Sequence, residues 1–113
     1  MTAAAHTKYK NQARILKALA HPTRLFIVEE LARGERSVRE LTDMIGVEMP
    51  TVSRHLSVLR NAGILADDKR GLQVFYSLRV PCVLNFFKCV EAVQRDDGKQ
   101  AKRKAPPEIC CAT

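Results

Sequence analysis

The sequence predicts a mainly α-helical fold with a small β-hairpin, of the winged helix-turn-helix type, and three observations carry this prediction. Two short helical segments meet at Gly46, an alternating apolar pattern follows Gly63, and further helical segments lie on both sides. The chain has 113 residues, which suits a single domain with one core. We expect the folded domain to span residues 7–95 and a flexible tail to span residues 96–113.

The first two predicted helices are apolar along one side and carry no catalytic constellation. The first spans Thr7 to Leu19, and its apolar stripe can pack on a partner. The second begins at Pro22, a residue favoured in a first helical turn, and ends before Gly34. Its core candidates are Leu25, Ile27, Val28 and Leu31.

Capping signals mark both helices of the predicted helix-turn-helix. Ser37 is the expected N-cap of the first helix, and Glu40 stands three residues later, at the spacing of a reciprocal capping box. Gly46 ends this helix. The second helix begins at Pro50 and ends at Gly63, where a left-handed conformation is least costly.

The second helix has one apolar side and one polar side. Val52, Leu56 and Leu59 repeat at helical spacing and should face a core. The opposite side contains hydroxyl, amide and arginine side chains: Thr51, Ser53, Arg54, Ser57, Arg60 and Asn61. No acidic residue occurs between Pro50 and Gly63, whereas a merely solvated helix would normally carry Glu and Lys at salt-bridge spacing.

This polar side suits contact with DNA. Hydroxyls and short amides reach phosphate oxygens, and one arginine can bind guanine in a bidentate way worth about 1–3 kcal/mol of discrimination. The chain as a whole is basic, with 19 Lys and Arg against 12 Asp and Glu and a pI near 9.6. RNA or an anionic membrane surface would also attract such a chain, so the helix pattern decides more than the charge.

After Gly63 the pattern changes to that of a β-hairpin. Ile64 and Leu65 open a short strand, residues 67–71 form the expected turn, and residues 72–78 alternate as a second strand. Lys69 and Arg70 are expected at the tip of this wing, where they can contact phosphates. The predicted DNA-binding residues are therefore Thr51, Ser53, Arg54, Ser57, Arg60, Lys69 and Arg70.

The last predicted helix begins at Pro81 and is apolar over more than one face. The rest of so short a chain can cover only part of it, so a two-fold partner is expected to cover the remainder. A dimer would also match a symmetric DNA site with half-sites one helical turn apart. We therefore expect a homodimer in which the last helix packs against the partner.

Three phrases of the sequence, LAHPTRL, TVSRHLSVLRNAGI and FYSL, resemble the ArsR/SmtB family of bacterial metal- and metalloid-sensing repressors. The resemblance covers about Ala13 to Val93. It implies a homodimeric winged helix-turn-helix repressor with the first and last helices at the dimer interface. Such a repressor binds double-stranded operator DNA until an inducer releases it.

The inducer site differs from the best-known patterns of that family. Arsenite sensors of the family place two cysteines at the start of the first helix-turn-helix helix, where this chain has Ser37 and Val38. Zinc sensors of the family use Asp and His residues around the last helix. At those positions Cys82 replaces the early His, and Val80 and Val93 replace the Asp and the late His.

Four cysteines are the candidate ligands: Cys82, Cys89, Cys110 and Cys111. Free thiols are expected inside a cell, so a structural disulfide is not expected. Cys82 and Cys89 are seven residues apart, which corresponds to about 10.5 Å along a helix, whereas two sulfurs on one ion lie within about 4.6 Å. The vicinal pair near the C-terminus is a better chelate, to which one thiolate of the last helix can be added.

We therefore expect trivalent arsenic, as arsenite or methylarsenite, to bind these thiolates and act as the inducer. Other thiophilic metals such as cadmium or lead, and a redox or persulfide signal, stay open as alternatives. A winged helix that binds an acidic protein partner is a more distant alternative.

Several function classes are not expected. The sequence has no Gly-rich phosphate loop and no Ser-His-Asp or Cys-His arrangement, so neither an enzyme nor an organic cofactor is predicted. It has no long apolar run and no signal sequence, so we expect a cytoplasmic protein that does not enter a membrane.

Overall fold

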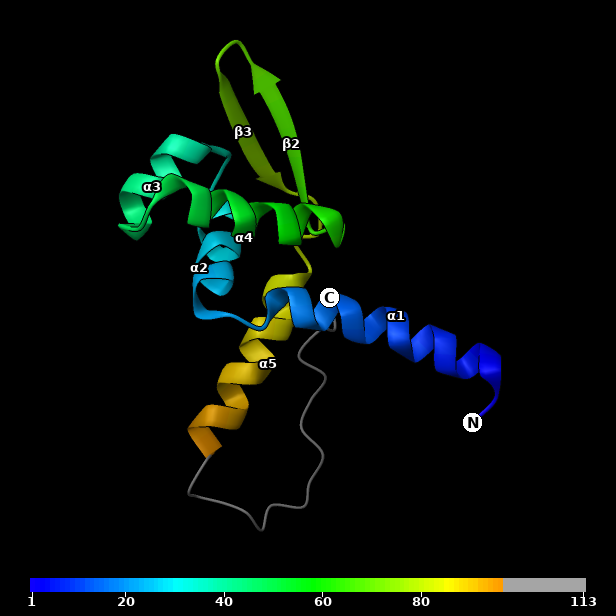
Figure 1. Cartoon of the computed structure of the whole chain (residues 1–113). Coiled ribbons are helices and arrows are strands. Elements are labelled where there is room, and N and C mark those ends of the chain that lie inside the picture. The colour runs from blue at the N-terminus through cyan, green and yellow to red at the C-terminus, as the bar shows by residue number, and fades with distance from the viewer. Residues whose placement is uncertain (97–113) are drawn as a thin grey trace. The chain divides into compact units, whose positions relative to one another are not determined.

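The computed structural model describes residues 1–96, which belong to two compact units (Figure 1). The first unit, Met1–Arg79, contains α1 (Ala3–Leu19), α2 (Pro22–Leu31), β1 (Arg36–Ser37), α3 (Val38–Ile45), α4 (Met49–Asn61), β2 (Leu65–Arg70) and β3 (Gln73–Leu78). The second unit begins at Val80 and contains α5 (Val83–Asp96). This order of elements confirms the predicted winged helix-turn-helix fold. In residues 1–96 no helix is both long and apolar enough to cross a membrane.

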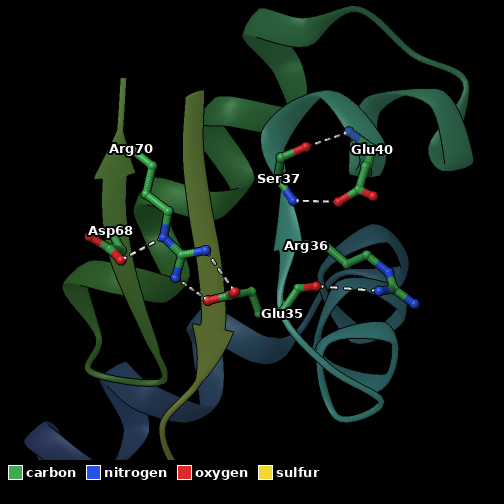
Figure 2. A network of polar contacts seen from close by, with 6 residues as sticks. All are labelled: Glu35, Arg36, Ser37, Glu40, Asp68 and Arg70. Carbon is green, nitrogen blue, oxygen red and sulfur yellow. Dashed lines mark hydrogen bonds and ion pairs between the residues drawn. The ribbon is translucent and has the colours of Figure 1, made fainter. Parts of the chain in front are cut away.

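Two reciprocal hydrogen bonds begin α3 (Figure 2). The Glu40 backbone N–H donates to Ser37 Oγ at 3.1 Å, and the Ser37 N–H donates to Glu40 Oε1 at 2.9 Å. The predicted capping box is therefore present. At the other end Gly46 has a φ of 84°, which confirms the expected left-handed stop. Only three residues, 46–48, separate α3 from α4.

The C-terminus of α4 is closed by a Schellman motif. Gly63, with a φ of 87°, donates its N–H to the Arg60 carbonyl at 2.9 Å, and the Ile64 N–H donates to the Leu59 carbonyl at 3.0 Å. Arg79 also stabilises this connection, because its Nη1 donates to the Gly63 carbonyl at 3.2 Å. The chain thus passes from α4 into β2 with a fixed direction.

The core of the first unit lies under α4. Val52, Leu56 and Leu59 are fully buried, as the helical spacing predicted. They belong to a core that also contains Ala18, Leu19, Ile27, Val28, Leu31, Leu41, Ile64, Leu65 and Tyr76. Leu25 was predicted to be a core residue, and this is wrong within the first unit, since its side chain is 39% exposed. It lies on the opposite side of α2 from the buried Ile27, at the edge of the buried side.

The sheet has three antiparallel strands in the order β1-β3-β2. β1 pairs Arg36 with Tyr76, a short strand that the sequence pattern did not predict. The hairpin turn also lies later than predicted, because Arg70 pairs with Gln73 and leaves only Gly71 and Leu72 between the strands. Gly71 has a φ of 63°, as a two-residue turn with glycine first requires. The residues expected to form the turn are therefore mostly strand, and Leu72 lies in the turn.

Helix α1 begins four residues earlier than predicted, since the Thr2 hydroxyl caps it by accepting from the Ala5 N–H at 3.1 Å.

In α5 the residues Phe86, Val90 and Val93 are exposed by 41%, 46% and 72%. The boundary between a domain at residues 7–95 and a tail at residues 96–113 stays a prediction, because residues 97–113 lie outside the described part of the chain.

Replacing the buried Ser37 with alanine should lower the free energy of unfolding by about 1 kcal/mol, because it removes the hydroxyl that accepts the Glu40 N–H at the start of α3. Urea denaturation followed by circular dichroism at one fixed protein concentration measures this loss. Thr7→Ala, at an exposed position within α1, is the matched control. Equal unfolding midpoints for the two variants would contradict the role of the capping box.

Candidate nucleic-acid interface

Burial of the apolar side of α4 leaves its polar side on the surface of the first unit. Arg54 and Arg60 are exposed, and Thr51, Ser53 and Ser57 are partly exposed. All five belong to one helix, which begins at Met49, one residue before the predicted Pro50, and is followed by the left-handed Gly63. The arrangement presents hydroxyl and guanidinium groups together, and such groups bind phosphate oxygens and base edges.

Arg70 at the end of β2 is held by two carboxylates (Figure 2). Its Nη1 and Nη2 donate to both oxygens of Glu35 at 2.9 and 2.8 Å, and its Nε donates to Asp68 Oδ2 at 2.9 Å. Its guanidinium also lies 4.6 Å from the centre of the Phe75 ring. The hydrogen bonds to Glu35 and Asp68 raise the pKa of Arg70. Arg70 therefore fastens the wing to the segment before β1 and has little capacity left for a phosphate.

Arg60 has a similar internal partner. Its Nη1 lies 3.1 Å from Asp67 Oδ2, so the last turn of α4 is joined to β2. In contrast, Arg54 and Lys69 form no ion pair within residues 1–96. Among the predicted DNA-binding cations, these two have their full charge available.

A hollow of about 320 Å³ separates α4 from the hairpin turn. Ser53 lines it together with Arg39 of α3 and Gln73 of β3. Sequence reasoning missed Arg39 and Gln73. The sequence did contain a signal for Arg39, because it stands two residues after the N-cap of α3. This position brings Arg39 beside the start of α4. These side chains widen the polar surface from one helix to a concave strip between α4 and the wing.

Two histidine rings, His55 of α4 and His21 at the start of α2, contact each other in a tilted arrangement. The His21 and His55 ring centres are 4.4 Å apart, and His21 Nδ1 accepts from the Thr23 N–H at 3.1 Å as the N-cap of α2. His55 Nδ1 is buried without a hydrogen-bond partner in the described residues. The pKa of His55 is lowered from 6.5, first because burial penalises the imidazolium and then because His21, Arg24 and Arg54 repel it. His55 therefore packs as a neutral ring near neutral pH.

The cysteines are only partly described. Cys82 precedes α5 as an exposed free thiol, whereas Cys89 within α5 is disulfide-bonded, so the expectation of free thiols is wrong for Cys89. Cys110 and Cys111 lie outside the described residues. Within residues 1–96, no group of three or more His, Cys, Asp and Glu side chains is placed to hold a metal ion.

Comparison with known proteins decides the family. Residues 21–67 match the family described as "Bacterial regulatory protein, arsR family". The crystal structure of the transcriptional repressor BigR from Xylella fastidiosa is 38% identical, with a TM-score of 0.62, and the match covers 88% of this chain and 100% of that one. The chain belongs to the arsR family. This confirms the resemblance recognised in the sequence.

Two further similar proteins support the assignment to the arsR family. The "Biofilm growth-associated repressor" of Xylella fastidiosa strain Temecula1 is 47% identical over 66 residues, which span 58% of this chain and 58% of that protein. The solution structure of the homodimeric winged helix-turn-helix domain of Mb0332 from Mycobacterium bovis has a TM-score of 0.73 at 26% identity and covers 93% of this chain and 97% of that one. These relatives are regulators of transcription, not enzymes.

Replacing Arg54 with alanine should weaken binding to the specific DNA site by about 5- to 150-fold, because an arginine contact with guanine is worth about 1–3 kcal/mol. Arg70→Ala should weaken it less, since Glu35 and Asp68 already occupy that guanidinium. Fluorescence anisotropy with a labelled duplex measures both. Arg33→Ala removes an exposed cation outside the interface and serves as the control. A larger loss for Arg70 than for Arg54 would contradict this division of roles.

Acid should destabilise the fold through His55. Below pH 6.5 the unfolded chain binds a proton that the folded chain resists, so the free energy of unfolding falls as the pH drops from 6.5 towards the lowered pKa. His55→Gln should therefore lose less stability than the wild type between pH 7.5 and pH 5.5 in urea denaturation. His6→Gln, on exposed α1, should behave like the wild type. An unchanged pH dependence in His55→Gln would show that this ring is not the titrating group.

Proposed function

We propose that this arsR-family protein is a homodimeric transcriptional repressor that binds double-stranded operator DNA through α4 and the wing. The single observation that carries the proposal is the polar side of α4, which presents Arg54 without an ion pair within residues 1–96 while its apolar side is fully buried. Thr51, Ser53 and Ser57 would contact the major groove with it. Lys69 would contact the backbone from the wing.

Dimerisation is supported by apolar side chains that the described residues leave exposed. Leu16 of α1 is 49% exposed, and Val93 of α5 is 72% exposed. A two-fold partner would cover such surfaces, and the Mycobacterium bovis neighbour is described as homodimeric. A dimer would also place two copies of α4 on a two-fold symmetric operator.

The inducer in this proposal is trivalent arsenic, as arsenite or methylarsenite, bound by the thiolates of Cys110 and Cys111 and by one thiolate from Cys82 or Cys89. The support is chemical: adjacent thiolates are soft ligands that suit a thiophilic centre, and the basic helix-turn-helix itself contains no cysteine. The ligand would favour a dimer spacing that does not match the operator. A coupling of about 1–3 kcal/mol would weaken DNA binding by about 5- to 150-fold.

A thiol redox switch is the second candidate function. The observation that favours it is the disulfide-bonded state of Cys89. In this alternative, oxidation of two thiols to a disulfide would release the DNA, and reduction by a cellular dithiol would restore binding. Cadmium and lead are alternative ligands for the same thiolates.

The test is a double variant, Cys110→Ser with Cys111→Ser, in the reduced full chain. It should bind operator DNA as tightly as the wild type and lose its release by arsenite and methylarsenite, because serine cannot supply a soft thiolate. Fluorescence anisotropy at constant reductant concentration measures both affinities. Cys82→Ser, at the exposed free thiol, shows whether that residue supplies the third ligand.

Two outcomes would contradict the arsenic proposal. One is a double variant that is still released by stoichiometric arsenite. The other is a wild type that is released only by an oxidant or by polysulfide, with mass spectrometry showing a reversible disulfide and no bound arsenic, which would establish the redox switch instead.

A further inference from the structure

A second hollow, lined by cations, lies among α1, α2 and the C-terminal end of α4. It has a volume of about 420 Å³. Arg14 and Lys17 line it from α1, Arg24 lines it from α2, and Asn61 lines it from the last turn of α4. The first three side chains are cations, and none of the lining residues in the described part of the chain is acidic.

In the described part of the chain, no ion pair neutralises these three cations. The ion pairs in residues 1–96 involve Arg36, Arg60 and Arg70, and none involves a cation of this hollow. Arg24 has an additional unused donor, because its Nε is buried and has no hydrogen-bond partner among the described residues. A buried donor without an acceptor is unfavourable, so this arrangement favours a ligand that brings acceptor oxygens.

The C-terminal ends of two helices offset only part of this positive charge. Lys17 lies in the last turn of α1, and Asn61 is the last residue of α4, so the negative ends of both helix dipoles are near the hollow. Each such end is equivalent to about half a negative charge, which together offset about one of the three cations. About two positive charges remain, which match the charge of a phosphate monoester.

The chemistry of the lining indicates the kind of anion. A guanidinium presents a planar fork of N–H groups that fits two oxygens of a phosphate, and Arg14 and Arg24 provide two forks on opposite helices. The Asn61 amide adds a neutral donor. Val58 and Ala62 form an apolar wall from the same end of α4, which can contact an uncharged part of the ligand.

We propose that this hollow is a phosphate-binding site formed by Arg14, Lys17, Arg24 and Asn61. The phosphate has two sources with the same chemistry: a small phosphorylated molecule, and the backbone of DNA held by α4. For the second source the inference rests on the proposed function, because Val58 and Asn61 continue the side of α4 that carries Arg54 towards the C-terminus of the helix.

The test follows the Arg24 Nε–H signal by NMR in the full-length reduced protein, assigned with Arg24→Lys. One titration adds inorganic pyrophosphate, and a second adds the operator duplex. We expect at least one of them to shift the signal in a saturable way. The double variant Arg14→Gln with Lys17→Gln should then bind the responding phosphate about 10-fold more weakly or worse, because it loses two charge-assisted hydrogen bonds.

Lys8→Gln with Lys10→Gln removes the same charge from exposed positions of α1 outside the hollow and should keep the wild-type affinity. A response to pyrophosphate assigns the site to a small phosphorylated ligand, and a response to the duplex alone assigns it to the DNA backbone. No response in either titration, or equal losses in the two double variants, would overturn the proposal. If the duplex binds but leaves the Arg24 signal unchanged and pyrophosphate does not bind, the repressor function stands and this site fails.

Discussion

The burial of three side chains of α4 is the constraint on which the rest of the structure depends. Val52, Leu56 and Leu59 are fully buried, and their spacing fixes the rotation of the helix about its own axis. Replacing Leu56 or Leu59 with alanine would lower the free energy of unfolding by about 2–5 kcal/mol. Because this side is held inward, Arg54 and the hydroxyl side chains are held outward. The Schellman motif at Gly63 then carries the same orientation into the wing.

Electrostatic partners decide which cations remain available for a nucleic acid. The chain has a formal charge of +7, but charge alone does not distinguish Arg54 from Arg70. Glu35 and Asp68 hold Arg70 in the wing, and this internal pairing stiffens the hairpin relative to β1. Within residues 1–96, Arg54 of α4 and the three cations of the hollow beside α1 form no ion pair. The protein therefore divides its arginines between fastening the wing and presenting charge.

Much of the fold could be predicted because its signals are local. The capping box at Ser37, the glycine stops and the apolar spacing in α4 depend on neighbouring residues, and all are present in the structure. The turn at Gly71 was misplaced because charged residues are typical of loops, yet cross-strand pairing extends β2 to Arg70. The pairing of Arg70 with Glu35 and the short strand β1 depend on contacts between residues 35 positions or more apart, which no local pattern contains. The thiolate ligands at Cys110 and Cys111 stay a prediction from chemistry.

We propose that α4 of this arsR-family protein recognises a specific operator sequence. The most direct measurement is fluorescence anisotropy of the reduced wild-type protein with a duplex from its own promoter and with a scrambled duplex, across a range of salt concentrations. The protein should bind the promoter duplex about 1,000-fold more tightly than the scrambled duplex, and its affinity should fall steeply as salt rises. Equal affinity for both duplexes, or an affinity that does not change with salt, would contradict it.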